Sequence, residues 1–248
     1  MRPAQPNQSL IDGLSVLQAL AAHGTPIGSR ELARMLGLEP TRANRLLKTL
    51  ALVGLAQQDA ARRYAPGPGI HVLAAQSLRG SGLIGRALGP LEELRSRGHV
   101  IAMGVLWWDQ VSYLYHAGAG AEHGRGIGGE ALFPAAQSGL GHALLAELSD
   151  EEIREIYSDG HRLHATRPDN EAVVLDGEDG LLAAIEGTRR RGYALTGVYG
   201  AEDPTRTIGV VVGDPVVAAI GMSGDFTDDE VPELVDALRA TAGRIAVA

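Results

Sequence analysis

The sequence predicts an α+β protein of two domains: a small helical N-terminal domain that carries a β-hairpin, and a larger mixed α/β domain. The length of 248 residues fits one large domain or two modest ones. The charge is divided, because residues 1–80 hold nine basic and four acidic residues, whereas the remaining residues hold 13 and 26. A segment of net charge +5 joined to one of −13 predicts two separate tasks within one chain.

The composition excludes several classes of protein. A hydrophobic content of 45% and a charged content of 21% are typical of a folded globular protein. With no cysteine, the chain has no disulfide scaffold, no cysteine-ligated metal and no thiol nucleophile. It has no apolar run of 18 residues, and its first eight residues lack the apolar segment of a signal peptide. We therefore expect a cytoplasmic protein with no membrane partner.

The first two predicted helices are short, and each ends at a glycine. The first begins at Ser9 and ends before Gly24. The second covers 29–36 and ends at Gly37. The apolar residues of the first helix recur at helical spacing, so we expect them to share its buried side: Leu10, Leu14, Leu17 and Ala21.

A third helix begins near Pro40, a residue that suits the first helical position. Its apolar residues lie at positions i, i+3, i+4 and i+7, and predict one buried stripe: Ala43, Leu46, Leu47 and Leu50. At 100° per residue, Thr41, Arg45 and Lys48 point away from that stripe, and Arg42 and Asn44 lie on its flanks. The helix therefore combines an apolar face with a basic, hydrogen-bonding face.

A short hairpin and a linker helix follow. The segments 55–58 and 63–65 read as strands around a turn at 59–62, and Pro66-Gly67-Pro68-Gly69 interrupts the chain. The next helix carries Ile70, Leu73, Ala74 and Leu78 on one side, and the seam between the domains falls at 80–82. The predicted regions are 1–66 for the first domain, 67–80 for the linker helix and 81–248 for the second domain.

The second domain mixes helices and strands. The predicted helices cover 83–97, 139–147, 150–157, 180–191 and 228–245. The predicted strands cover 100–106, 111–115, 208–212 and 216–222, and a glycine-rich loop spans 118–129. Trp107 and Trp108 are adjacent at a turn, and we expect one to face inward and the other outward.

Three short helices followed by a hairpin form the plan of a winged helix-turn-helix, a DNA-binding domain. A helix fits the major groove, where exposed arginine, asparagine and threonine side chains reach base edges and phosphates. The alternative is an ordinary helical bundle whose basic face is merely solvated. The residues expected to contact double-stranded DNA are Ser29, Arg30, Thr41, Arg42, Asn44, Arg45, Lys48, Arg62 and Arg63.

Six segments, in order along nearly the whole chain, resemble those of the IclR family of bacterial transcription regulators. Three lie in the first domain, at 9–20, 31–38 and 41–50. Three lie in the second: Gly-His-Ala-Leu-Leu-Ala at 141–146, Arg-Arg-Arg-Gly-Tyr-Ala at 189–194 and Ala-Ala-Ile-Gly-Met-Ser-Gly at 218–224. In the first of these, His142 replaces the lysine of the family pattern.

The resemblance implies that the second domain is an effector-binding domain related to GAF and PAS sensor domains. It also implies homodimers or homotetramers on palindromic operators. By position, the effector site would comprise Phe133, Ser138, Gly139, Leu140, Thr207, Gly221 and Ser223. In the family, a serine is frequent at the position of Gly221, and acidic residues are common at the positions of 197–200. Because this chain departs from the family at both places, a larger or less charged ligand than a small carboxylate fits at least as well.

Other signals are weaker. The loop at 118–126 has the glycines of a phosphate loop but does not lead cleanly into a helix. Ser138 lacks the flanking glycines of a nucleophile elbow. His161 and His164 lack a third metal ligand, so we expect surface histidines there.

We therefore expect a transcription regulator, acting as a repressor, whose operator affinity is set by a small metabolite. We expect no enzyme, no cofactor and no metal site, because no acid/base or nucleophile set has the required spacing. Two alternatives remain: an enzyme on the α/β domain, and an adaptor that uses the winged helix for protein contacts.

Overall fold

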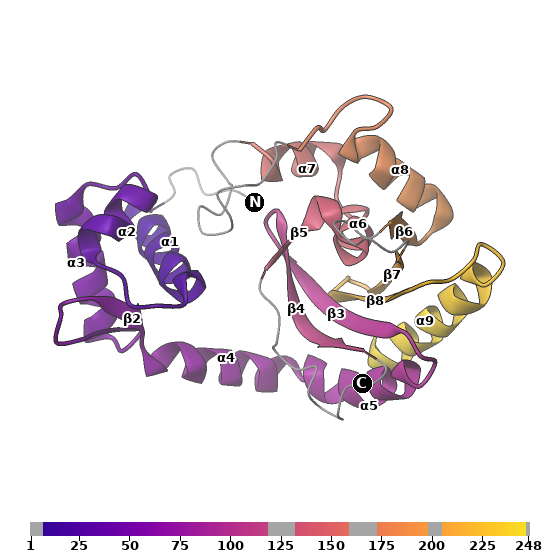
Figure 1. The fold of residues 1–248 in the computed structure, drawn as a ribbon, viewed down its shortest axis with the longest axis horizontal. Coiled ribbons are helices and arrows are strands. Elements are labelled where there is room, and N and C mark those ends of the chain that lie inside the picture. The colour runs from indigo at the N-terminus through magenta and orange to yellow at the C-terminus, as the bar shows by residue number, and fades with distance from the viewer. Residues whose placement is uncertain (1–6, 119–131, 159–172, 198–204, 247–248) are drawn as a thin grey trace. The chain divides into compact units, whose positions relative to one another are not determined.

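The computed structural model describes residues 7–118, 132–158, 173–197 and 205–246 (Figure 1). The chain divides into two compact units, and the boundary along the sequence falls between Ser81 and Gly82. Among the described residues, no helix is both long enough and apolar enough to cross a lipid bilayer.

The N-terminal unit is a winged helix-turn-helix. Its elements are helices α1 (Gln8–His23), α2 (Ser29–Met35) and α3 (Pro40–Leu52), strands β1 (Ala56–Gln58) and β2 (Tyr64–Pro66), and helix α4 (Pro68–Ser81). Ile27 adds a third extended segment, because its N–H and C=O both bond the backbone of Tyr64 at 2.8 Å. The core lies between the helices and this sheet, and contains Val16, Ala19, Leu20, Ile27, Leu32, Leu47, Ala56 and Tyr64.

The first helix differs from the expectation at its start and in its buried face. Its N-cap is Asn7 rather than Ser9, and the Asn7 side chain accepts hydrogen bonds from the backbone N–H groups of Ser9 and Leu10. Leu10 and Leu14, expected to be buried, are 61% and 52% exposed. The buried residues are instead Asp12, Val16, Ala19 and Leu20.

The expectation failed because α1 has two apolar stripes of helical period, and packing against α3 decides between them. Gly13 lies beside α3, where a β-carbon would be in ordinary van der Waals contact with Leu46 Cδ2, at 3.8 Å. Val16 and Leu20 pack in one cluster with Leu47 of α3, which places their stripe inward and leaves Leu10 and Leu14 exposed.

The other elements of the N-terminal unit lie near their expected positions. Helix α3 begins at Pro40, with Ala43 and Leu47 fully buried and Leu46 and Leu50 half-buried, as the stripe predicts. Helix α4 begins at Pro68, inside the expected chain break, because proline is favourable in the first helical turn. None of the residues of α4 is buried.

The C-terminal unit contains one antiparallel sheet of six strands in the order β5-β4-β3-β8-β7-β6 (Figure 1). The strands are β3 (Val100–Trp107), β4 (Gln110–Ala117), β5 (Phe133–Pro134), β6 (Ala194–Gly197), β7 (Arg206–Val212) and β8 (Ala218–Gly224). The two short strands, β5 and β6, form the edges of the sheet and were not predicted.

Helices cover both faces of this sheet. Helices α5 (Leu83–Arg95) and α9 (Val231–Ala246) pack on one face in a single apolar cluster. The other face carries the short 3-10 helix η1 (Ala135–Gln137) and helices α6 (Gly139–Leu145), α7 (Asp150–Ile156) and α8 (Leu181–Arg191), which share a second cluster. The expected mixed α/β architecture is confirmed.

The tryptophan pair contradicts the expectation that one ring faces inward. Trp107 and Trp108 are 38% and 42% exposed, because Trp108 takes a left-handed conformation with φ of 57° at the tip of the β3–β4 hairpin. The two residues therefore do not alternate as neighbours on a strand do. Most of the glycine-rich loop, together with His161 and His164, lies outside the described residues.

Candidate nucleic-acid interface and ligand site

Helix α3 presents the predicted basic face to solvent. Thr41, Arg45 and Lys48 are exposed, and Asn44 is half-buried beside them. Within the described part of the chain, neither Arg45 nor Lys48 has an ion-pair partner. The helix is held from behind by Ala43 and Leu47, so its outer face is free to enter a groove of DNA.

Arg42 is the exception on this helix, because its guanidinium is engaged. Its Nε lies 2.5 Å from Oδ2 of Asp12 on α1 in an ion pair, although the Nε–H has no hydrogen-bond partner among the described residues. The other carboxylate oxygen, Oδ1, accepts a hydrogen bond of 2.7 Å from Nε2 of Gln8. The Arg42 guanidinium therefore contributes to the contact between α1 and α3.

The wing carries two exposed arginines at its tip. Arg62 has a φ of 60°, and the turn is closed by Asp59, whose side chain accepts the Arg63 N–H at 2.8 Å. The Arg63 guanidinium lies 3.9 Å from the Glu31 carboxylate, a long and exposed ion pair. Of the remaining predicted contacts, Arg30 is exposed on α2 and Ser29 is half-buried.

In the C-terminal unit, the predicted effector residues Ser138, Gly139, Leu140, Thr207, Gly221 and Ser223 meet around the start of α6. Ser138 is the N-cap of α6 and accepts the Gly141 N–H at 3.2 Å. Thr207 and Ser223 are paired neighbours on β7 and β8, with hydroxyls 2.7 Å apart. A β-carbon on Gly139 would lie 2.5 Å from Thr207 Cγ2, so α6 touches this part of the sheet. The seventh, Phe133, lies on β5.

Glycines on three neighbouring strands make this contact possible. A β-carbon at Gly209 would lie 2.5 Å from the Gly139 carbonyl, and one at Gly221 would collide with Cδ1 of Leu140. At Gly104 it would lie 3.4 Å from Cδ2 of the same leucine. Leu140 is buried on this flat surface, so Gly139, Leu140 and Gly221 pack together, whereas the hydroxyls surround them.

Aromatic and polar residues that the sequence analysis did not select complete the cluster. The Tyr113 hydroxyl lies 3.2 Å from Ser138 Oγ. The Tyr113 ring meets His116 and Phe133 edge to face, at centroid distances of 5.7 and 6.4 Å. Thr196 on β6 pairs with Thr207 and adds a hydroxyl to the row. Tyr113 shares a face with Val111 by strand alternation, which is a signal that the sequence did contain.

His142 lies in the core rather than in a ligand site. Its Nε2 lies 2.9 Å from the Ala136 carbonyl. Burial lowers the pKa of His142 below its usual range and Arg191 lowers it further, while the hydrogen bond to Ala136 acts in the opposite direction. Because the folded chain disfavours the protonated ring, acidification favours unfolding here.

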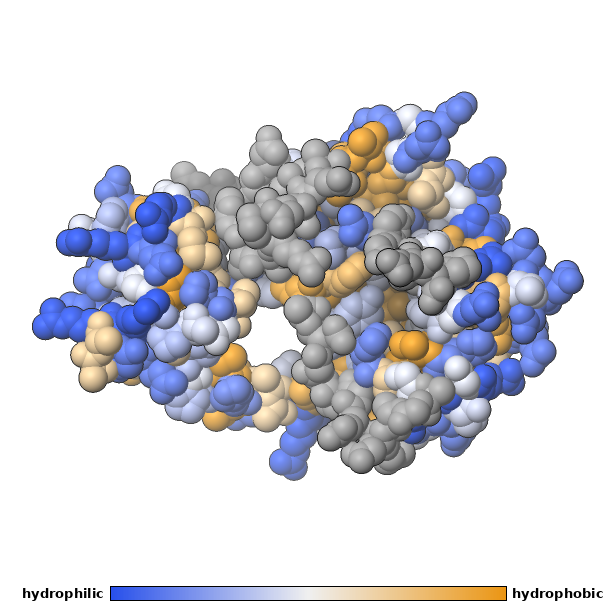
Figure 2. Space-filling model, viewed as in Figure 1, coloured by the Kyte–Doolittle hydropathy of each residue, from blue (hydrophilic) through white to orange (hydrophobic). Residues whose placement is uncertain are grey.

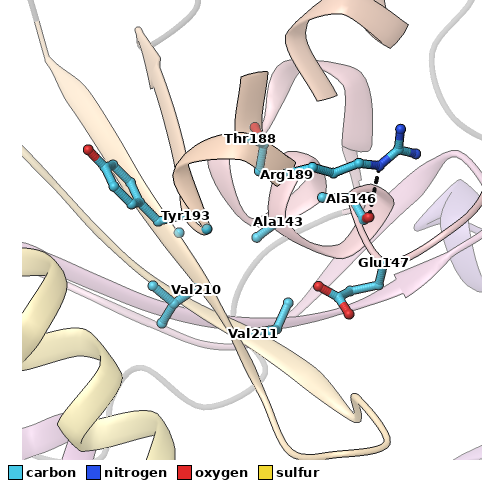
Figure 3. Close-up of a pocket in the computed structure, with 10 residues that line it drawn as sticks. Ala143, Ala146, Glu147, Thr188, Arg189, Tyr193, Val210 and Val211 are labelled. Atoms are coloured by element: carbon cyan, nitrogen blue, oxygen red, sulfur yellow. Dashed lines mark hydrogen bonds between the residues drawn. The ribbon is translucent and has the colours of Figure 1, made fainter. Parts of the chain in front are cut away.

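A pocket of about 230 Å³ lies at the other end of α6 (Figure 3). Arg189 contributes its aliphatic stem, while its guanidinium donates to the Ala146 and Leu148 carbonyls and to Asp150, at 2.7 to 3.1 Å. None of the seven predicted effector residues lines this pocket. Its lining residues are Ala143, Ala146, Glu147, Thr188, Arg189, Gly192, Tyr193, Gly209, Val210 and Val211.

Among the described residues, no three histidine, aspartate or glutamate side chains lie close enough together to form a metal site. The polar atoms around the start of α6 are hydroxyls paired with one another or with backbone. Such groups can hold a small organic ligand by hydrogen bonds.

A winged helix-turn-helix with an exposed basic reading helix defines a DNA-binding domain, and a helix-covered antiparallel sheet forms a second domain. Residues 9–60 match the family model of the IclR helix-turn-helix domain. The N-terminal unit is thus an IclR-type DNA-binding domain, and the chain as a whole has the fold of the IclR family transcriptional regulators of known structure.

Three solved structures illustrate this likeness. An IclR family transcriptional regulator from Brucella abortus has a TM-score of 0.75 at 23% identity, covering 99% of this chain and 93% of its own. An IclR regulator from a Silicibacter species has a TM-score of 0.75 at 24% identity, covering 97% of both chains. An IclR homologue from Microbacterium hydrocarbonoxydans, in complex with 4-hydroxybenzoate, has a TM-score of 0.66 at 21% identity, covering 96% of this chain and 97% of its own. No curated protein matches the chain.

Proposed function

We propose that this protein is a cytoplasmic, non-enzymatic transcription repressor that binds a palindromic DNA operator as a homodimer or homotetramer and responds to a small organic effector. In this proposal residues 1–66 read DNA, 67–80 link the domains, and 81–248 bind the effector and support assembly. The observation that carries the proposal is the exposed cationic face of α3 within an IclR-type helix-turn-helix domain. Repression follows simply from operator occupancy, because the bound protein excludes other proteins from the same DNA.

Substitution of one residue on this face tests the proposal. We expect Arg45→Ala to abolish operator binding and leave the melting temperature nearly unchanged, because Arg45 is exposed. Arg190→Ala removes the same charge from the exposed surface of α8, in the C-terminal unit, and should retain binding. The DNA is a duplex that the full-length wild type enriches from a random 30-base-pair library, and fluorescence anisotropy gives the affinity. Unaltered binding by Arg45→Ala would contradict the assigned face.

A dimer suits both the DNA and the surface of the N-terminal unit. One short reading helix covers few base pairs, and two-fold symmetry doubles the contact. Helix α4 has 14 residues and none is buried, although a helix of that length is marginal by itself in water. In Figure 2, hydrophobic surface is visible among hydrophilic residues in the region of α4. We infer that α4 and the exposed leucines of α1 contact a second copy.

The effector in this proposal is a small molecule with an aromatic ring and a hydrogen-bonding substituent. The hydroxyls of Tyr113, Ser138, Thr207 and Ser223 supply the polar partners, and Tyr113 and Phe133 supply ring surface. The binding of 4-hydroxybenzoate by the Microbacterium homologue supports this ligand class. A ligand that binds one geometry of the dimer more tightly than another shifts the dimer toward that geometry. The resulting change in operator affinity is limited by the difference between the ligand's affinities for the two geometries.

Thermal denaturation of the full chain tests this ligand class, because a ligand that binds only the folded state raises the melting temperature. We expect 4-hydroxybenzoate and related phenols to stabilise the wild type, and Ser223→Ala to reduce the shift. Cyclohexanol, which lacks the aromatic ring, is the control. An equal shift with the control, or stabilisation by small aliphatic carboxylates alone, would contradict the aromatic assignment.

A further inference from the structure

Asp12 lies where the core-facing stripe of α1 would carry an apolar residue. It precedes Val16, Ala19 and Leu20 at i+4, i+7 and i+8, and it is only 7% exposed. A carboxylate in such a position is costly unless it is paired and hydrogen-bonded. Here Oδ1 accepts a hydrogen bond from Gln8, and Oδ2 forms an ion pair with Arg42, whose Nε–H has no hydrogen-bond partner among the described residues.

The partner of Asp12 lies in the first turn of the reading helix. Arg42 is the third residue of α3, and in helix-turn-helix domains the N-terminal residues of the reading helix contact base edges. Asp12 holds the guanidinium at Nε. Among the described residues this Nε–H makes no hydrogen bond, so the contact is an ion pair. The ion pair keeps the guanidinium beside Asp12 and thereby limits where its two terminal nitrogens can reach.

The Arg42 side chain remains 36% exposed although its Nε is held, whereas that of Asp12 is only 8% exposed. The two residues are therefore placed differently: Arg42 can reach beyond the protein surface, and Asp12 can act only through Arg42. The pair joins α1 to the reading helix by charge beside the apolar contact of Ala43 and Leu47.

We propose that Asp12 is a positioning residue for DNA recognition, which aims the terminal nitrogens of Arg42 at a pair of oxygen or nitrogen acceptors on the duplex. This inference rests on the proposed DNA-binding function. The acceptors belong either to a guanine edge or to a phosphate, and the two sources differ in their effects. Loss of a guanine contact relaxes the preference for one DNA sequence. Loss of a phosphate contact weakens binding to all sequences and makes the slope of log affinity against log salt concentration shallower by about 1.

The direction in which one substitution changes DNA affinity distinguishes this positioning role from simple electrostatic repulsion. Removing a carboxylate near a polyanion normally strengthens binding. We expect Asp12→Asn instead to weaken binding of the enriched duplex at least about fivefold. A loss of that size is expected when one directed contact with the DNA is lost. Glu39→Gln is the matched control, because Glu39 is an exposed acid at the start of α3 without a capping hydrogen bond, and it should bind equally or more tightly.

A double-mutant cycle separates positioning from damage to the fold. Asp12→Asn should have little further effect on DNA affinity in an Arg42→Ala background, since no guanidinium is left to aim. Arg42→Lys should resemble Asp12→Asn, because an ammonium keeps the charge but cannot present a planar pair of donors. Affinities are measured on the full chain for the enriched duplex and a scrambled duplex of equal length, across a salt series and at temperatures where circular dichroism shows each variant folded.

Two results overturn the inference: Asp12→Asn binding as tightly as the wild type or more tightly, or an equal loss of affinity in the Arg42→Ala background. A wild type that enriches no duplex would instead overturn the proposed function, and this inference with it. If the wild type binds the duplex, Arg45→Ala does not and Asp12→Asn binds as tightly as the wild type, the inference about Asp12 is contradicted and the proposed function still stands.

Discussion

At the scale of single residues, the start of α6 shows how small side chains shape the C-terminal unit. Leu140 lies on a surface made flat by Gly104, Gly209 and Gly221, which come from three different strands. Interiors are packed so densely that one added methyl group forces neighbours to move. The glycines therefore determine how closely α6 approaches the sheet and the hydroxyls around it.

Gly221→Ala tests this packing. The new methyl group would collide with Leu140 and lie 2.9 Å from the Ile208 carbonyl, so we expect a loss of about 1–3 kcal/mol in the free energy of unfolding. Urea denaturation of the full chain measures it. Gly243→Ala is the matched control, because nothing lies within 4 Å of its β-carbon position on α9, and helical alanine is favoured over glycine by about 1 kcal/mol. Equal stability of Gly221→Ala and the wild type would show that Leu140 moves aside at no measurable cost in free energy.

Residue-level features differ in how far the sequence predicts them. The exposed face of Arg45 and Lys48 follows from helical geometry alone. The Asp12–Arg42 pair does not, because it joins two helices 30 positions apart and depends on their crossing. Gly221 could be aligned with an effector position, but only the structure shows that Leu140 occupies the space above it.

At the scale of elements, α1 carries two apolar faces, and among the described residues only one of them packs in the core. Val16, Ala19 and Leu20 enter the core, whereas Leu10, Ile11 and Leu14 are exposed. Exposed leucines at helical spacing indicate a surface that another molecule covers. In the proposed dimer, that molecule is a second copy of the chain.

Substitution of the exposed leucines tests the dimer. We expect Leu10→Ser combined with Leu14→Ser to weaken self-association at least about tenfold, because each buried leucine contributes about 1.5–3 kcal/mol. Sedimentation equilibrium gives the association constant. Leu52→Ser is the control, since Leu52 is also exposed but lies at the end of α3. Unchanged association of the double variant would remove α1 from the interface.

Elements were predictable where they were long and periodic. Helices α3, α5 and α9 and strands β3, β4, β7 and β8 lie close to the expected ranges. Strands β5 and β6 have two and four residues, too few for an alternation to be seen, and their pairing with β4 and β7 defines them. Asn7 rather than Ser9 caps α1, because both residue types cap helices and only the backbone geometry chooses between them.

At the scale of the whole molecule, the division of charge bears on the proposed function. The chain as a whole has a net charge of −8, which by itself would argue against a nucleic-acid partner. Residues 1–80 are nevertheless basic, and the exposed cations Arg45 and Lys48 lie on the face that a groove of DNA would meet. The acidic remainder should be repelled by phosphate, which restricts the DNA contact to the N-terminal unit.

The salt dependence of DNA binding by the full chain tests the central claim most directly. Displacing counterions from several phosphates makes affinity fall steeply with salt, with a slope of about −0.9 per contact on a logarithmic plot. We predict a fall of at least about tenfold between 50 and 200 mM salt for the enriched duplex, and a slope about 1 unit shallower for Lys48→Ala. An affinity that stays constant over this range would contradict DNA binding through the face of α3.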